Sequence, residues 1–382
     1  MNRYELRLLL YTTVAAFAAL YAPQPILPRL AADFGVSPSD ASLLISATMI
    51  PLGLAPVIYG YLIEAVPARL VLLWAIALLI AGQLLFALTD HYGVLLAARL
   101  LQGLAFPATF TAIMTYCSTS ATRESVRRVI GYYVAATILG GFGGRLLSGV
   151  IASAFSWRET FLLLALMLSL SFVLILRLPG GKRIDFARLD RRAISRVLGH
   201  APARYGLLVI FCVFFTFASL LNALPFNLRE NDAGISDFVI SLVYAGYIVG
   251  VVVALQVARI SRLLGGDLRV IQTGLVLFAA GTALFALPGT VTAITVMFVF
   301  VTGMFMVHST LSGFLNHIAA EHKGVVNGLY ISFYYSGGAI GSWLPTLVYS
   351  RFGWQLFICV LLGVCALAGY FAYRLSVALR DA

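Results

Sequence analysis

Long apolar stretches dominate the hydropathy pattern of this chain, and short polar segments interrupt them at nearly regular intervals. Each stretch has about the 20 apolar residues that a helix needs to cross the hydrocarbon core of a bilayer. Most of the interruptions contain Pro, Gly, Asp or Arg, which are typical of turns between helices. The pattern predicts twelve membrane-spanning helices, at approximately residues 8–28, 41–63, 69–88, 93–116, 129–152, 159–177, 205–228, 238–260, 269–287, 291–315, 325–350 and 354–374.

The composition excludes the main classes of water-soluble protein. Of the 382 residues, 61% are apolar and only 11% are charged, whereas an ordinary soluble domain has about 25% charged residues. Water-facing surface has to be covered with polar groups, so no soluble fold could hide this much apolar side chain. We therefore expect an all-α membrane protein and not an enzyme. The four cysteines lack metal-ligand spacing, and neither a metal nor a cofactor is expected.

The basic residues are distributed unevenly between the two sets of connecting segments. With the N-terminus inside, the inner segments contain 20 Lys and Arg residues and the outer segments contain 4. Because positive residues mark the cytoplasmic side, this bias predicts that both termini lie in the cytoplasm. The scattered cations argue against a nucleic-acid partner, although the net charge is +11. The expected partners are a small-molecule substrate, protons and the lipids of a bacterial inner membrane, and the expected state is a monomer.

An internal repeat relates the two halves of the chain. Six identities recur at one offset of 197 residues between the fifth and eleventh spans and the loops that follow them. Small residues of this kind allow close helix packing in membranes, but a shared register through a loop indicates duplication. We therefore predict two pseudo-symmetric six-helix bundles with parallel topology. The repeated glycines expected to pack helices are Gly131, Gly140 and Gly144 in one half, and Gly328, Gly337 and Gly341 in the other.

The predicted domain boundaries follow from this repeat. The N-terminal bundle is placed at residues 1–177 and the C-terminal bundle at residues 205–382, with a cytoplasmic linker at 178–204. In the linker, Phe186, Leu189, Ala193 and Val197 stand at helical spacing among five arginines. This spacing predicts a basic amphipathic helix on the inner leaflet, although a solvated linker fits almost equally well.

Four motifs in the expected spans resemble those of the major facilitator superfamily, and the resemblance covers nearly the whole chain. Arg99-Leu100-Leu101-Gln102-Gly103 resembles an element of its proton-coupled efflux branch, and span five resembles that branch's glycine-rich antiporter element, with Arg145 replacing the usual Pro. The loop after span two is a degraded form of the superfamily signature, Gly60-Tyr61-Leu62-Ile63-Glu64-Ala65-Val66-Pro67-Ala68-Arg69. Span one is similar to arabinose-efflux-like permeases through Tyr21-Ala22-Pro23-Gln24-Pro25-Ile26-Leu27-Pro28.

Two arginines inside spans are the leading candidates for a binding site. Placing Arg99 or Arg145 at mid-span costs roughly 2.5–3.5 kcal/mol on insertion scales, so each is expected to face a cavity. The alternative is that each caps backbone carbonyls or extends its charge outward. With these two cations and no acid in the middle of any span, such a cavity favours neutral, zwitterionic or anionic solutes over cationic ones. The other expected substrate-binding residues are polar or aromatic: Tyr21, Gln24, Gln102, Asn222, Tyr244, Tyr247, Phe305, His308, Tyr330 and Tyr334.

Proton coupling is implied mainly by the resemblance. The candidate groups are Asp33 at the outer end of span one, the region of Arg99, and His308 in span ten. An imidazole can titrate near neutrality where it is hydrated, but a neutral histidine that bonds a neighbouring helix is an equal alternative.

The loop motif and the repeat together predict a gate at the cytoplasmic end. At an offset of 198 residues, Arg262 corresponds to Glu64 and Asp267 to Arg69, with the charge order inverted. Our hypothesis is that these two pairs close the inner end, through interactions of about 1 kcal/mol each where exposed. Solvated loop charges are the alternative, at almost even odds.

The sequence thus favours a secondary transporter that exports a small organic solute by alternating access in exchange for protons. The absence of a Gly-x4-Gly-Lys-Ser/Thr phosphate loop argues against ATP drive. Two alternatives stay open. One is a facilitator or anion-coupled carrier that uses Arg99 and Arg145 as its anion site, and the other is a lipid flippase.

Overall fold

A computed structural model describes residues 3–62, 66–120, 126–179, 183–184, 191–318 and 323–380. Nearly all of these residues are helical. The first half contains α1 (Arg3–Tyr21), the short 3-10 helix η1 (Gln24–Ile26), α2 (Leu27–Phe34), α3 (Pro38–Leu62), α4 (Ala68–Leu88), α5 (Tyr92–Ser120), α6 (Val126–Ala154) and α7 (Trp157–Ile175).

The second half repeats this arrangement after a short connecting region. That region contains α8 (Arg191–Gly199), and its strand β2 (Arg183–Ile184) pairs antiparallel with β1 (Val66–Pro67). The helices that follow are α9 (Ala201–Asn231), α10 (Asp237–Leu242), the 3-10 helix η2 (Val243–Gly246), α11 (Tyr247–Leu264), α12 (Asp267–Leu284), α13 (Thr290–Ile318) and α14 (Lys323–Arg380).

The described helices account for the twelve predicted spans. Ten helical segments are long and apolar enough to cross a membrane, and α3 covers the second predicted span. Helix α14 contains two spans, because Gly353 has φ 81° and interrupts its 58 residues. A positive φ is far easier for glycine than for other residues, so this position ends one span and allows the next to begin. The predicted all-α membrane fold is confirmed.

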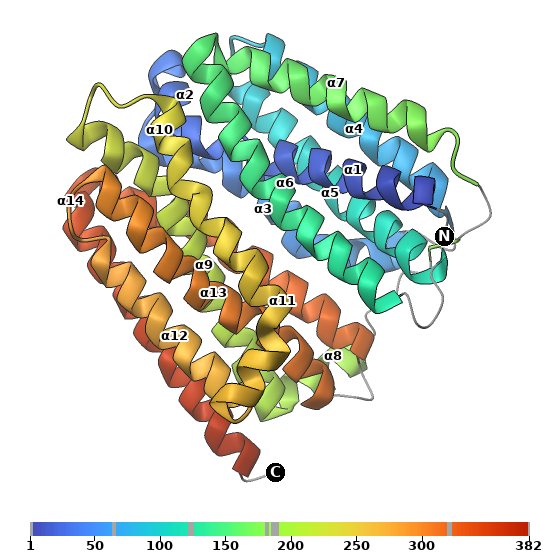
Figure 1. The fold of residues 1–382 in the computed structure, drawn as a ribbon, viewed down its shortest axis with the longest axis vertical. Coiled ribbons are helices and arrows are strands. Elements are labelled where there is room, and N and C mark those ends of the chain that lie inside the picture. The colour runs from blue at the N-terminus through green and yellow to red at the C-terminus, as the bar shows by residue number, and fades with distance from the viewer. Residues whose placement is uncertain are drawn as a thin grey trace.

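The helices form two groups that meet along a central interface (Figure 1). The first-half helices, blue to green, lie on one side, and the second-half helices, yellow to red, lie on the other. Helices α2 and α10 lie together at one end of the molecule, away from both chain termini. We call this the far end, and the opposite one the termini end.

Close helix packing within each group depends on some of the repeated glycines. A Cβ at Gly144 would lie 2.4 Å from the backbone of Ala18 in α1, and one at Gly341 would lie 2.2 Å from the Phe215 carbonyl in α9. Gly140 and Gly337 make similar approaches to α1 and α9. At Gly131, in contrast, nothing lies within 4 Å, so close packing does not require glycine there.

This geometry gives a prediction with a built-in control. Gly144→Ala should destabilise the protein by about 1–3 kcal/mol, because the new methyl group collides with backbone that cannot rotate away. Gly143→Ala, one residue earlier in the same helix, meets open space and should leave the thermal unfolding midpoint unchanged or slightly raised. Equal midpoints for the two variants in detergent would contradict the packing described.

The connecting region is only partly described. Helix α8 buries Ala193 and Val197 and exposes its three arginines, as the amphipathic pattern requires, whereas Phe186 and Leu189 lie outside the described residues. The location of α8 on a membrane surface, and the domain boundaries at 177 and 205, stay predictions.

Candidate functional site

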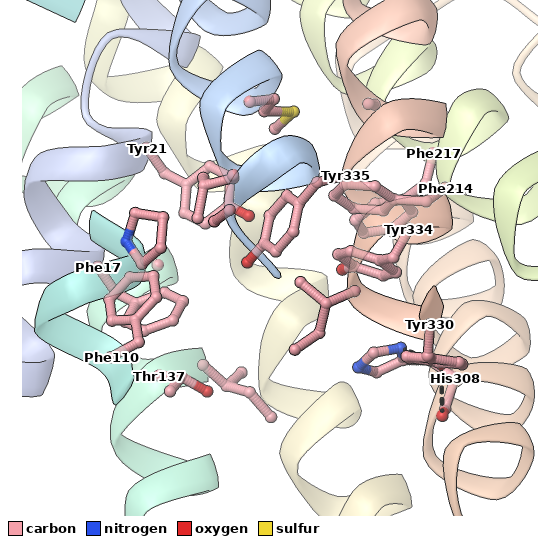
Figure 2. A pocket seen from close by; sticks show the side chains of 18 of the residues that line it. Phe17, Tyr21, Phe110, Thr137, Phe214, Phe217, His308, Tyr330, Tyr334 and Tyr335 are labelled. Atoms are coloured by element: carbon pink, nitrogen blue, oxygen red, sulfur yellow. Dashed lines mark hydrogen bonds between the residues drawn. The ribbon is translucent and has the colours of Figure 1, made fainter. Parts of the chain in front are cut away.

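A cavity of about 570 Å³ lies between the two groups of helices. Its walls come from both halves and are rich in aromatic side chains: Figure 2 shows Phe17, Tyr21, Phe110 and Thr137 facing Phe214, Phe217, His308, Tyr330, Tyr334 and Tyr335. Among the described residues that line it, Arg145 is the only charged side chain other than a histidine, and there is no Asp or Glu. The cavity can therefore hold an amphipathic solute but offers no carboxylate to a cation.

Some residues that line the two walls of the cavity are equivalent positions of the internal repeat. Phe17 and Phe214, like Tyr133 and Tyr330, stand 197 positions apart in the sequence. In the first half, the rings of Phe17 and Phe110 stack at 4.3 Å between centroids. In the second half, Phe214 stacks on Tyr334 at 3.6 Å. The equivalent residues Phe17 and Phe214 thus face the same space, although their stacking partners come from helices that are not equivalent, α5 and α14.

Arg145 lines the cavity from the part of α6 that leads to the far end, and it is fully buried. Its guanidinium donates to Gln24 Oε1 at 2.7 Å, to the Gly141 carbonyl at 2.8 Å and to the Tyr247 hydroxyl at 3.2 Å. It also lies over the rings of Tyr21 and Tyr247, 4.2 and 4.6 Å from their centroids. These rings offset part of the cost of burying the charge. Tyr247 belongs to the second half, so the guanidinium joins the two halves.

An amide pair lies beside Arg145 on the interface between the halves. Gln24 Nε2 donates to Asn222 Oδ1, and Asn222 donates to the Ser342 carbonyl. Gln24 and Asn222 are 198 positions apart, and Arg145 and Ser342 are 197 apart. The contacts are thus pseudo-symmetric, but only the first half carries the charge.

His308 lies in the second-half wall of the cavity. Its Nδ1 shares a hydrogen bond of 2.8 Å with the Tyr330 hydroxyl, which also donates to the His308 carbonyl (Figure 2). The imidazole ring also faces Tyr334, with 4.9 Å between centroids. His308 is half-buried, so a proton can reach it from the cavity.

Arg99 was predicted to bind substrate, but it is not among the described residues that line the cavity. It donates to the carbonyls of Ala19, Leu20 and Leu44, and to Gln102 Oε1. Pro23 lacks the N–H that would bond the Ala19 carbonyl in a continuous helix, and Arg99 Nη1 takes this role at 3.2 Å. In this structure Arg99 therefore caps backbone carbonyls, which was the alternative to a binding role.

The other predicted binding residues divide into two sets. Those at the cavity are Tyr21, Gln24, Arg145, Tyr247, Phe305, His308, Tyr330 and Tyr334. Gln102 supports Arg99, and Asn222 bonds Gln24 behind the cavity wall. Tyr244 donates to the Leu221 carbonyl at 2.8 Å, with its ring facing Arg145.

At the far end, the two halves are held together by polar contacts that the sequence did not reveal. Asp237 in α10 is only 4% exposed and accepts from Arg29 at 3.1 Å and from Arg229 at 2.6 Å. Arg29 belongs to the first half and also donates to the Ala152 carbonyl in α6. The Phe238 N–H donates to Ser153 Oγ at 2.8 Å. These contacts close the interface between the first turn of α10 and the end of α6.

In the sequence, Arg29 and Arg229 only contributed to the count of positive residues that predicts the orientation in the membrane. Their spacing of 200 positions, close to the repeat offset, could have indicated that they are equivalent residues of the two halves. It could not show that Asp237 lies between them.

The remaining predicted residues lie away from the cavity. Asp33 is exposed at the far end and accepts from Trp157 Nε1 at 2.7 Å, so it holds α2 against α7 and does not face the cavity. Of the predicted cytoplasmic gate, Glu64 lies outside the described residues. Arg69 donates to the Leu176 carbonyl, and Asp267 accepts from Ser261 Oγ. Both contacts stay within one half, and the pairing of Arg69 or Arg262 across the halves stays a prediction.

Nearly the whole chain matches a known family. The family model of the major facilitator superfamily matches residues 9–342 and 207–380. The chain therefore belongs to the major facilitator superfamily, and it is a multi-pass membrane transporter rather than an enzyme.

Individual relatives extend this assignment. The chain is 27% identical to "Inner membrane transport protein YnfM" of Escherichia coli over 372 residues, which cover 94% of this chain and 88% of that protein. It is 24% identical to "Multidrug efflux protein YfmO" of Bacillus subtilis, with 90% and 85% covered.

A solved structure of a bacterial homologue of the human lysosomal transporter Spinster, in an inward-facing and occupied conformation, has a TM-score of 0.82. It is 13% identical and covers 99% of this chain, and 97% of its own length is matched. At this identity the likeness shows the fold alone.

Proposed function

We propose that this protein exports a small amphipathic organic solute across a bacterial inner membrane, in exchange for protons, with both termini in the cytoplasm. The observation that carries the proposal is a central cavity bounded by both halves, whose far end is closed by polar contacts between the halves. Its lining residues run from Arg145 to Gly324 and Gly328 at the start of α14, near the termini end. The contacts of Asp237 lie at the other end.

This arrangement supports alternating access. With the termini in the cytoplasm, the termini end faces inward, and the far end faces outward. Export then requires the Asp237 contacts to break while the termini end closes. Rocking of two bundles around a fixed central site is how repeat-built transporters work.

The charge of the cavity supports a preference among solutes. A cationic solute would lose its hydration and face Arg145 with no carboxylate to compensate. Neutral, zwitterionic or anionic solutes avoid this cost, and aromatic walls suit a solute with an apolar body.

His308 is the proposed proton carrier, because Asp33 and Arg99 do not line the cavity. Its described neighbours in the cavity are Phe305, Tyr330 and Tyr334, and none of the described residues that line this space is acidic. A proton gained by His308 adds a second positive charge to the cavity. Release of the solute can be coupled to this change of charge.

Inside-out vesicles that are acidified inside provide the test. Small amphipathic solutes that stabilise the purified protein should dissipate the pH gradient in vesicles with the wild type. His308→Gln should abolish this dissipation yet keep downhill exchange of the solute, because the cavity keeps its shape. Indifference of uphill transport to a protonophore would instead favour a facilitator or anion-coupled carrier, and scrambling of labelled lipids with no solute flux would favour a flippase.

A further inference from the structure

We infer that the solute carries a carboxylate, and that this carboxylate, by binding Arg145, releases the contacts that hold the far end closed. The inference rests on the proposed transport function and adds to it a substrate class and a trigger. The inference rests on two roles of the Arg145 guanidinium, which can bind an anion and which links the two halves.

The first purpose is recognition. Arg145 is fully buried, and no acid lines the described part of its cavity. Three of its five N–H groups donate to Gln24, Gly141 and Tyr247, and the other two have no acceptor among the described residues. All three acceptors are neutral. A carboxylate is the ligand that matches a guanidinium in both charge and two-pronged geometry.

The second purpose is closure of the interface. The Arg145 guanidinium belongs to α6 in the first half, while the Tyr247 hydroxyl and ring that it contacts belong to α11 in the second. Its partner Gln24 also bonds Asn222 of the second half. An anion that draws the guanidinium toward the cavity therefore weakens two links between the halves. A neutral or cationic solute lacks this effect.

The rest of the cavity defines the other part of the solute. Phe17, Phe110, Phe214 and Tyr334 present stacked rings on the termini side of Arg145, where an apolar body can lie while its carboxylate reaches the guanidinium. The class is therefore an amphipathic monocarboxylate with an aromatic or branched apolar body.

Binding of three matched probe series tests the recognition step. The probes are phenylalkanoates with two to six methylene groups, the corresponding amides and the corresponding amines, titrated calorimetrically into the purified full-length protein. The wild type should bind the best carboxylate about tenfold or more tightly than its amide, as expected for hydrogen bonds to a charged group. In Arg145→Gln the ratio of the carboxylate affinity to the amide affinity should fall to about 1–3. The thermal unfolding midpoint of this variant should be no lower than that of the cavity variant Tyr247→Phe.

Accessibility of the far end tests the release step. Ser241 is fully buried at the α10–α6 contact, so Ser241→Cys in a Cys359→Ala background reports opening by its rate of reaction with a maleimide. The carboxylate should accelerate this reaction and the amide should not. Tyr247→Phe removes one link between the halves but keeps the guanidinium. It should raise the basal rate while retaining the preference for the carboxylate.

The outcomes separate this inference from the transport function. Equal binding of carboxylate and amide, or an unchanged preference in Arg145→Gln, would overturn the inference and leave transport of another amphipathic solute intact. Carboxylate binding without faster labelling would overturn the trigger. Failure of every member of the three series to bind would contradict both the inference and the proposed use of this cavity for amphipathic solutes.

Discussion

Arg99→Leu is expected to prevent the protein from accumulating in a folded form. The substitution leaves the buried carbonyls of Ala19 and Leu20, and the buried Gln102 Oε1, without the donor that the structure provides. Each buried polar group that loses its partner costs about 1–3 kcal/mol, and the total is comparable to the whole stability of many domains. The measurement is the yield of monodisperse protein in detergent, with its thermal unfolding midpoint.

Arg145→Met is the matched control for this prediction. It removes a guanidinium of equal burial, but one whose partners are mostly side chains around a cavity and its own helix. We expect this variant to fold and to lose its tighter binding of the carboxylate over the amide. A well-folded Arg99→Leu variant that had lost solute binding alone would show that Arg99 is a ligand and not a cap.

Asp237→Asn is expected to shift the protein toward a state with the far end open. The asparagine keeps the size of the side chain but removes the charge that holds Arg29 and Arg229 together. Two arginines then face each other without a carboxylate. Loss of charge-assisted hydrogen bonds at this largely buried site should cost the closed state about 2 kcal/mol, a change of roughly thirtyfold in the population ratio.

The reaction rate of Ser241→Cys with a maleimide measures this shift, and it should rise in Asp237→Asn. Asp90→Asn provides the control. Asp90 pairs with Arg158 at 2.6 Å at the same end of the molecule, but it is 86% exposed and both partners belong to the first half. An exposed pair within one half contributes little and does not join the halves. Equal rates in the two variants would show that Asp237 does not hold the far end closed.

The fold could be predicted from the sequence because its determinants are periodic and redundant. Span length, the positive residues and the repeat register each constrain the same twelve-helix arrangement, and losing one of them would not change the result. The repeated Gly140, Gly144, Gly337 and Gly341 also indicated which helices approach closely. Gly131 and Gly328 share the register but not the environment, since one faces open space and the other lines the cavity.

The site could be predicted only in part, because residue type does not reveal where a side chain points. Arg99 and Arg145 both stand inside spans, yet one caps carbonyls beside a proline and the other lines the cavity. Pro23 was a usable signal, since it leaves a carbonyl that some donor must satisfy. Asp237 could not be recognised, because its partner Arg29 lies 208 positions away in the sequence and belongs to the other half.

The central claim is that the two halves pivot about one cavity, so that its two ends open in turn. Spin labels in a Cys359→Ala background at Phe155 and Phe352 report the far end, and labels at Arg177 and Leu263 report the termini end; all four positions are exposed. Double electron–electron resonance in lipid nanodiscs, with and without a stabilising solute, gives both distances. We predict that the first distance lengthens as the second shortens. Two distances that stay fixed, or that lengthen together, would contradict the claim.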